Sequence, residues 1–110
     1  MIKNSNGNNI FISDWLNPTC KELTDLSIAQ KIKEECDFNR MIKKYNTITF
    51  YFPYLFNISF NWLDELFGEI LVEHGVKTFK SQIKFDWKND DFGREIGGVI
   101  NKYDKGKNGK

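Results

Sequence analysis

The feature that most constrains the fold is the apolar run Thr47–Phe52, which is followed directly by Pro53. Its β-branched and aromatic residues are typical of a strand, and proline ends the run because it has no backbone N–H for a neighbouring strand. An unbroken apolar run indicates burial on both faces, as in a central strand flanked by helices. We therefore predict a central strand of a sheet at this position.

The residues after this strand predict a loop and then a helix. The loop, from Pro53 to Phe60, is rich in aromatic residues. Asn61 is predicted as the helix N-cap, with Asp64 at the third helical position, and Gly75 as the left-handed residue that ends the helix. One apolar stripe at helical spacing connects these two ends. It consists of Leu63, Leu66, Phe67, Ile70, Leu71 and His74.

The first half of the chain predicts an edge strand, a loop and a helical region. Ile10–Ser13 is a short apolar run of the kind found in edge strands, and residues 14–23 read as a loop around Asn17-Pro18. Ser27, followed three residues later by Gln30, forms a capping-box signature for a helix from Ser27 to Cys36. Helical spacing continues to Tyr45, and the pattern leaves open whether this is one helix or two.

The last third of the chain predicts one more strand and one more helix. Side chains alternate in character over Ser81–Trp87, which indicates a strand with one solvated face. Asp90 or Asp91 is predicted to cap the final helix, and Gly97-Gly98 within it indicates either close packing on the sheet or a helix break. The alternation of strands and helices predicts an α/β domain with about four strands and helices packed against them.

Length and charge set the class of protein. A chain of 110 residues forms one domain, predicted at residues 10–103 between a polar leader at 1–9 and a flexible polar tail at 104–110. The net charge of +1 provides no strong field to attract nucleic acid or an anionic membrane. The first residues are polar and no apolar run is long enough to span a bilayer, which predicts a cytoplasmic protein.

Few residues have the pattern that catalysis or metal binding requires. His74 is the only histidine and lies at a predicted helix end, where interaction with the helix dipole explains it. Asp64 and Glu65 are adjacent, so on a helix they project about 100° apart and cannot form a catalytic dyad. Cys20 and Cys36 lack metal-site spacing and are predicted as small buried hydrophobic residues. We predict a non-enzyme without cofactor or metal.

The aromatic loop is the strongest candidate for an interaction surface. Tyr54, Phe56 and Phe60 fit either of two roles, core plugs beneath the helix or an exposed apolar patch of the kind that marks interfaces. No Lys or Arg occurs from Phe50 to Phe67, so base stacking supported by phosphate contacts is not expected. We predict that at least one of the three is exposed, with Tyr54 first because it directly follows Pro53.

Residues Ile48–Gly68 resemble the STAS-like domain family, relatives of bacterial anti-sigma-factor antagonists. The resemblance is strongest in the run Leu63-Asp64-Glu65-Leu66-Phe67-Gly68, and the loop isoleucine of the family matches Ile58. The strand near Ile83–Trp87 and a helix ending near Tyr103 are similar to the family's last elements. The resemblance covers about Ser27 to Tyr103 and implies a STAS-like sheet.

Two departures from the family pattern affect the expected mechanism. Tyr51 stands where the family has an aspartate at the strand end, and Asn61-Trp62 stands where it has serine and phenylalanine. In the antagonists, a partner kinase phosphorylates a serine at this helix start and thereby blocks binding. Asn61 has no hydroxyl to modify, which leaves Ser59 as a possible substitute acceptor.

The resemblance implies a non-catalytic regulatory module that binds a histidine-kinase-like ATPase or an anti-sigma-type partner. The alternative is a structural subunit of an obligate oligomer, which would associate with itself through residues 53–60. Both hypotheses place the contact at the loop and the start of the following helix. The predicted partner-binding residues are Tyr54, Phe56, Asn57, Ser59, Phe60, Asn61, Asp64 and Glu65.

Overall fold

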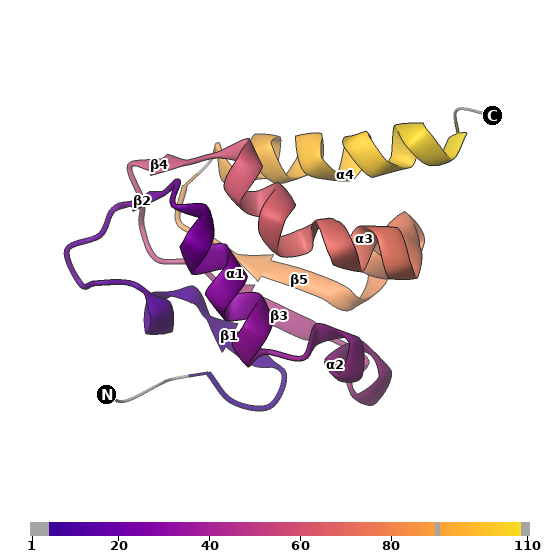
Figure 1. Cartoon of the computed structure of the whole chain (residues 1–110), viewed down its shortest axis with the longest axis horizontal. Helices are drawn as coiled ribbons and strands as arrows, with labels where there is room; N and C mark the ends of the chain where they lie inside the picture. The colour runs from indigo at the N-terminus through magenta and orange to yellow at the C-terminus, as the bar shows by residue number, and fades with distance from the viewer. Residues whose placement is uncertain (1–4, 90, 109–110) are drawn as a thin grey trace.

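A computed structural model describes residues 5–89 and 91–108 as a mixed α/β fold, which confirms the predicted fold class (Figure 1). Its strands form two small sheets in place of the single predicted one. The three-stranded sheet contains β1 (Asn9–Phe11), β3 (Ile48–Tyr51) and β5 (Ile83–Asp86), and the two-stranded sheet contains β2 (Glu22–Leu23) and β4 (Asn57–Ile58). The helices are η1 (Ile12–Trp15, a 3-10 turn), α1 (Leu26–Glu35), α2 (Phe38–Lys44), α3 (Phe60–Gln82) and α4 (Phe92–Asn108).

The central position predicted for β3 is confirmed. The order of the larger sheet is β1-β3-β5, and both pairings of β3 are parallel. β1 is an edge strand, as predicted for Ile10–Ser13, although it begins one residue earlier and turns into η1 at Ile12. The alternation predicted for the last strand is also confirmed, with Ile83 buried and Lys84 and Asp86 exposed.

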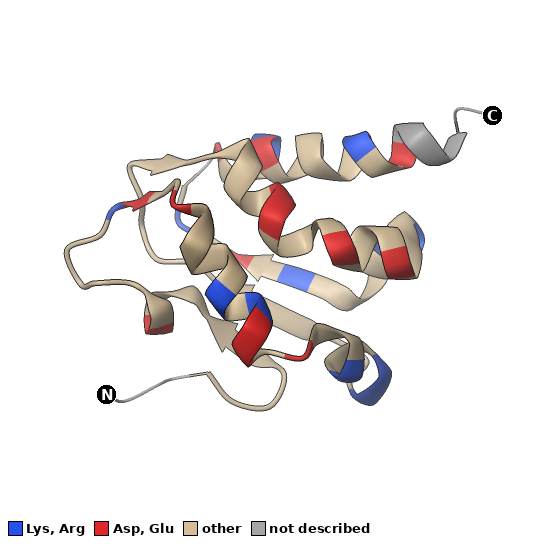
Figure 2. Ribbon diagram, in the orientation of Figure 1, with Lys and Arg blue, Asp and Glu red and all other residues tan. Residues whose placement is uncertain are grey.

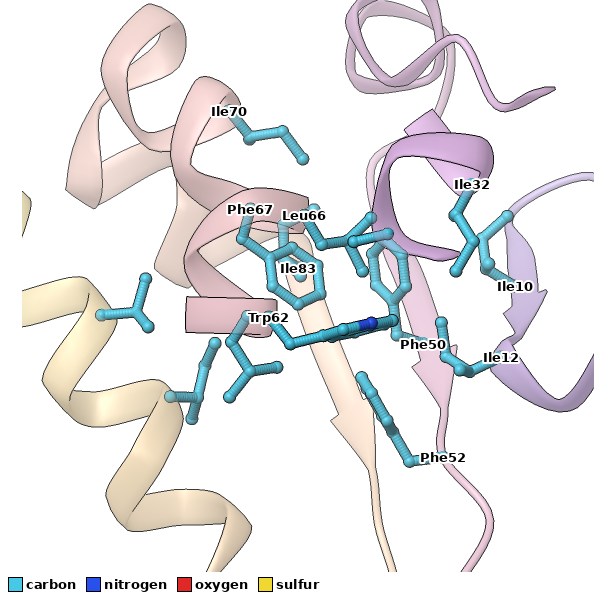
Figure 3. Close-up of a cluster of buried hydrophobic side chains, with 14 of the residues drawn as sticks. Ile10, Ile12, Ile32, Phe50, Phe52, Trp62, Leu66, Phe67, Ile70 and Ile83 are labelled. Atoms are coloured by element: carbon cyan, nitrogen blue, oxygen red, sulfur yellow. The ribbon is translucent and has the colours of Figure 1, made fainter. Parts of the chain in front are cut away.

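The chain adds the strands of this sheet in one direction, and this decides where the helices lie. Parallel crossovers are almost always right-handed, so successive steps in one direction place every crossover helix on the same face. The ring of Phe50 in β3 accordingly contacts Phe38 of α2 and Phe67 of α3, at 5.6 and 4.9 Å between centroids. Figure 3 shows Ile32 of α1 on that same side of the sheet.

Among the described residues, no helix packs against the opposite face of the sheet, so the predicted burial of β3 on both faces is wrong. Thr49 and Tyr51 are partly exposed, whereas Ile48 and Phe50 are buried. Tyr51 lies outside the core, with its ring stacked on Phe11 of β1 at 4.3 Å. An aromatic residue that stacks on a neighbouring strand at an open sheet face, as Tyr51 does, extends an apolar run in the sequence just as a buried residue would.

The core is a cluster of aliphatic and aromatic side chains between the sheet and the helices (Figure 3). Phe85 of β5 is partly buried at its edge and contacts the rings of Phe67, Phe79 and Phe92 at 5.4, 6.1 and 5.5 Å. Trp62 is fully buried, and its Nε1 finds no hydrogen-bond partner among residues 5–89 and 91–108. A buried donor without an acceptor destabilises the fold, because it loses its hydrogen bond to water.

The first helical region is two helices, broken at Cys36 and Asp37. Asp25 caps α1 by accepting a hydrogen bond from Ser27 N at 3.0 Å, and Asp37 caps α2. The predicted capping box at Ser27 is therefore wrong, because the Ser27 hydroxyl donates to the Asp25 carboxylate at 2.7 Å. These hydrogen bonds from Ser27 lower the pKa of Asp25 below its ordinary value.

α3 begins and ends differently from the prediction. Its N-cap is Ser59, so the helix starts one residue before Asn61. Gly75 has φ 89°, a conformation that residues with a Cβ rarely adopt, and it interrupts the helix as predicted. The chain does not enter a loop there, however, and helical structure resumes at Val76 and continues to Gln82. This second segment replaces the first residues of the strand predicted from Ser81.

α4 runs through the glycine pair without a break, so the close-packing interpretation applies. A Cβ on Gly98 would lie 3.4 Å from the ring of Phe60, which shows that α4 packs closely on α3 at this point rather than on the sheet. Asp91 precedes the helix, and Glu95 N donates to its carbonyl at 3.2 Å. The other predicted cap, Asp90, lies outside the described residues.

Parts of the predicted leader and tail are ordered elements of the fold. Ser5 N donates to Asp14 Oδ2 at 2.7 Å, and Phe11 N donates to Ser5 Oγ at 2.7 Å. α4 continues to Asn108, so residues 104–108 are helical; residues 1–4 and 109–110 lie outside the described part. In that described part, no helix has the length and apolar character needed to cross a membrane.

Candidate functional site

The aromatic loop, residues 53–60, leaves the sheet at the carboxyl end of β3 and leads into α3. Its third residue, Leu55, is buried and anchors the loop. Asn89 holds the backbone at this point, because Leu55 N donates to Asn89 Oδ1 at 3.0 Å and Asn89 Nδ2 donates to Leu55 O at 2.5 Å. One side chain, 34 positions away in the sequence, thus satisfies both backbone groups of the anchor residue.

A second restraint comes from the segment before α1. Phe56 N donates to Lys21 O at 2.7 Å, and Ser59 N donates to Leu23 O at 3.1 Å. Between these two bonds, β2 and β4 pair in parallel, with Leu23 opposite Ile58. The loop is therefore fixed on two sides, by Asn89 and by the chain around β2.

Two aromatic side chains project from this fixed loop into solvent. Tyr54 is 53% exposed and Phe56 is 72% exposed, on either side of the buried Leu55. Their rings contact each other edge to face, with 5.9 Å between centroids. The predicted exposure of Tyr54 is confirmed, and Phe56 is more exposed still. Phe60 is partly buried against α4 and has the plug role instead.

The polar residues around this pair differ in their roles. Ser59 is partly buried, and its Oγ accepts a hydrogen bond from Trp62 N at 3.0 Å, as an N-cap does. Asn57 and Asn61 are exposed. The hydroxyl at the start of α3 therefore belongs to Ser59, and Asn61, predicted as the cap, is an exposed residue of the first turn.

Asp64 and Glu65 connect α3 to two other helices. Asp64 accepts hydrogen bonds from Tyr103 Oη and, at 2.8 Å, from Lys102 Nζ, both on α4. Glu65 accepts from Lys33 Nζ of α1 at 2.9 Å. The two carboxylates therefore point to different neighbours, as their adjacent positions predicted. Because their oxygens are engaged within the fold, these residues act first as links between helices.

This link explains the glycine that ends the run Leu63–Gly68. A Cβ on Gly68 would lie 2.6 Å from Tyr103 Oη, so only glycine leaves room for the tyrosine to reach Asp64. Partial burial, and then the hydrogen bond to Asp64, raises the pKa of Tyr103 above its ordinary value. The same carboxylate raises the pKa of Lys102.

The charge distribution distinguishes the aromatic loop from the helices. Figure 2 shows charged residues on the helices, with acidic residues along the first part of α3 and both signs on α1, whereas residues 53–60 carry no charge. An uncharged patch with exposed aromatic side chains is typical of the centre of a protein interface.

The candidate catalytic and metal-binding residues do not come together. His74 Nε2 lies 2.7 Å from Asn39 Oδ1 of α2. Asp64 and Glu65 instead contact α4 and α1. Cys20 and Cys36, predicted as buried, are both partly exposed. Over the described residues, no group of three His, Cys, Asp or Glu side chains is placed to hold a metal ion.

The two restraints on the loop were not predicted from the sequence. Asn89 lies in a polar stretch between the last strand and α4, where asparagine is expected for its turn propensity alone. Lys21 contributes only a backbone carbonyl, for which side-chain identity gives no signal.

The chain matches no protein-family model, no curated protein sequence and no solved structure. The features of the chain that bear on its function are therefore the geometry of the aromatic loop and the sequence run that follows it.

Proposed function

We propose that this domain is a non-catalytic regulatory module of the STAS-like type that binds a protein partner through the aromatic loop. The partner is a histidine-kinase-like ATPase or an anti-sigma-type regulator. The observation that carries the proposal is the exposure of Tyr54 and Phe56 on a loop that Asn89 and the β2 segment hold in place.

The aromatic loop lowers the free-energy cost of binding a partner. Aromatic side chains bury a large area for few rotatable bonds, and they are over-represented among residues that dominate binding energy. A loop that is already fixed loses less conformational entropy on association than a mobile one. Asn57 and Asn61, both exposed beside the pair, supply the polar rim that such interfaces have.

The start of α3 is the position at which this proposal places regulation. Asn61 cannot accept a phosphate, so a kinase-type partner that modifies this helix start would act on Ser59. The Ser59 hydroxyl already accepts a hydrogen bond from Trp62 N at 3.0 Å. A phosphate there would add negative charge a few residues from Tyr54 and Phe56, and so change the surface that the partner contacts.

The core favours the regulator over the obligate subunit. Large apolar side chains from all four helices and the larger sheet are buried within one chain. The radius of gyration is 13.6 Å, close to the roughly 13 Å expected of a compact chain of this length. A domain that completes its core alone does not need a second subunit in order to fold.

The test measures binding to the purified product of a neighbouring gene that encodes a histidine-kinase-like ATPase. We expect Tyr54→Ala and Phe56→Ala each to raise the dissociation constant about tenfold or more, as measured by isothermal titration calorimetry. Val72→Ala is the matched control, because Val72 is an apolar residue of α3 that is 68% exposed. Equal affinity of all three variants and the wild-type chain would place the interface elsewhere.

A further inference from the structure

The face of the larger sheet that lacks helices is the second unusual surface of this molecule. Parallel sheets are normally covered on both faces. Here the bare face consists of outward-facing residues from all three strands, none of them buried. These residues are Asn9, Phe11, Thr49, Tyr51, Lys84 and Asp86.

The strand register arranges these residues in two rows. Thr49 of β3 is opposite Asn9 on one side and Lys84 on the other. The next row has Tyr51 at its centre, with Phe11 and Asp86 as its neighbours. Each row therefore ends on β5 in a charged side chain, and the two charges are opposite in sign.

The second row also carries apolar surface. The rings of Phe11 and Tyr51 are nearly parallel, at an interplanar angle of 7°, and neither belongs to the core. A hollow of about 200 Å³ adjoins them, lined in part by Ser13, Pro53 and Lys88. A stacked aromatic pair beside a hollow presents apolar surface that a second protein surface could bury.

We propose that the bare face binds a second copy of this chain. A twofold axis that runs across the strands, between the two rows, would place each row opposite the other row of the partner subunit. Lys84 would then face Asp86 of the partner subunit, and Asp86 would face Lys84 of the partner subunit. With the axis between the two rows, both ion pairs follow from the register, because the two charged residues are two positions apart on the same face of β5.

The side chains involved are available for this pairing. Lys84 is exposed and makes no ion pair within the part of the chain that the structure describes. Asp86 pairs only loosely with Lys88, at 3.7 Å, and both of these side chains are about half exposed. Exposed pairs of this kind contribute little stability, so Asp86 can exchange its partner readily.

The size of the face sets the strength of the association. Three strands about 4.8 Å apart present a narrow surface, well below the roughly 800 Å² per subunit of a standard stable interface. The dimer is therefore weak and depends on concentration. It uses a surface different from the tip of the aromatic loop, so a dimer and a bound regulatory partner are compatible.

The experiment is a charge-exchange series measured by sedimentation equilibrium over a wide concentration range. We expect the wild-type chain to dimerise, and Lys84→Glu and Asp86→Lys each to weaken dimerisation about tenfold or more, because each brings like charges together. The double variant K84E/D86K restores opposite charges across the axis and should recover dimerisation. Lys77→Glu, an equal charge change at an exposed position of α3, is the control.

Three results would overturn the proposal. One is a wild-type chain that stays monomeric at every concentration, and another is a folded double variant that fails to recover. The third is a dimer that is lost with Tyr54→Ala but kept with Lys84→Glu, which would assign self-association to the aromatic loop. Thermal melts of each variant show that it is folded. Loss of partner binding by the loop variants is measured separately, so either proposal can fail alone.

Discussion

Phe50 of β3 and Phe52 just after it lie only a few positions from the aromatic residues Tyr54 and Phe56 of the loop, yet the surroundings of the two pairs are opposite. Phe50 and Phe52 are 0% and 3% exposed, whereas Tyr54 and Phe56 are 53% and 72% exposed. All four are large and apolar, so hydrophobicity does not separate them. The backbone separates them: strand pairing directs Phe50 into the core, and the fixed anchor Leu55 leaves its two neighbours facing solvent.

The largest expected effect tests this difference directly. Phe50→Ala should destabilise the fold by about 3–5 kcal/mol, because it removes a ring in contact with several others and leaves a cavity. Phe56→Ala should change the free energy of unfolding by less than about 0.5 kcal/mol, as exposed substitutions do. Urea denaturation of both variants measures the two values. Similar losses for the two would mean that Phe56 is also part of the core.

An intermediate effect is expected at the junction of the two regions, where α3 begins. Ser59→Ala should cost about 1 kcal/mol of stability, because Trp62 N loses its capping acceptor. Asn61→Ala is the matched control and should be nearly neutral, since Asn61 is exposed and Ser59 is the cap. Thermal unfolding followed by circular dichroism distinguishes them. A larger loss of stability for Asn61→Ala would show that Asn61, as the sequence pattern predicted, is the N-cap of α3.

The smallest effect concerns Trp62, whose buried indole N–H has no acceptor in the described part of the chain. Trp62→Phe should leave the free energy of unfolding within about 1 kcal/mol of the wild-type value, because removal of an unpaired indole N–H offsets lost packing. Trp62→Leu, which also lacks the N–H but discards the aromatic ring, serves as the comparison and should be clearly less stable. Loss of several kcal/mol in Trp62→Phe would indicate that the indole nitrogen has a partner, such as a buried water.

Much of the fold could be predicted because its signals are local. The run Thr47–Phe52 identified the central strand, and the stripe from Leu63 to His74 identified the first part of α3. The bare face could not be predicted, because it depends on the order in which distant strands pair. The use of Ser59 rather than Asn61 as the cap could not be predicted either, because a distant contact, the hydrogen bond from Ser59 N to Leu23 O, fixes where the helix begins.

The aromatic loop was found from composition, but its rigidity was not. Tyr54 and Phe56 follow a proline outside any periodic pattern, which is a usable signal for exposure. Asn89 holds the loop from 34 positions away, and no local rule links it to Leu55. The roles of Asp64 and Glu65 as links between helices were hidden for the same reason, since Lys33 and Lys102 lie on other helices.

The bare face also has a calorimetric consequence. Apolar surface that is already hydrated in the folded chain contributes nothing to the heat capacity increase on unfolding. A domain with one open sheet face should therefore show a smaller increase than a domain of equal length sealed on both faces, and a broader, flatter curve of stability against temperature. Because that surface would be withdrawn from water on self-association, the heat capacity of unfolding should rise with protein concentration.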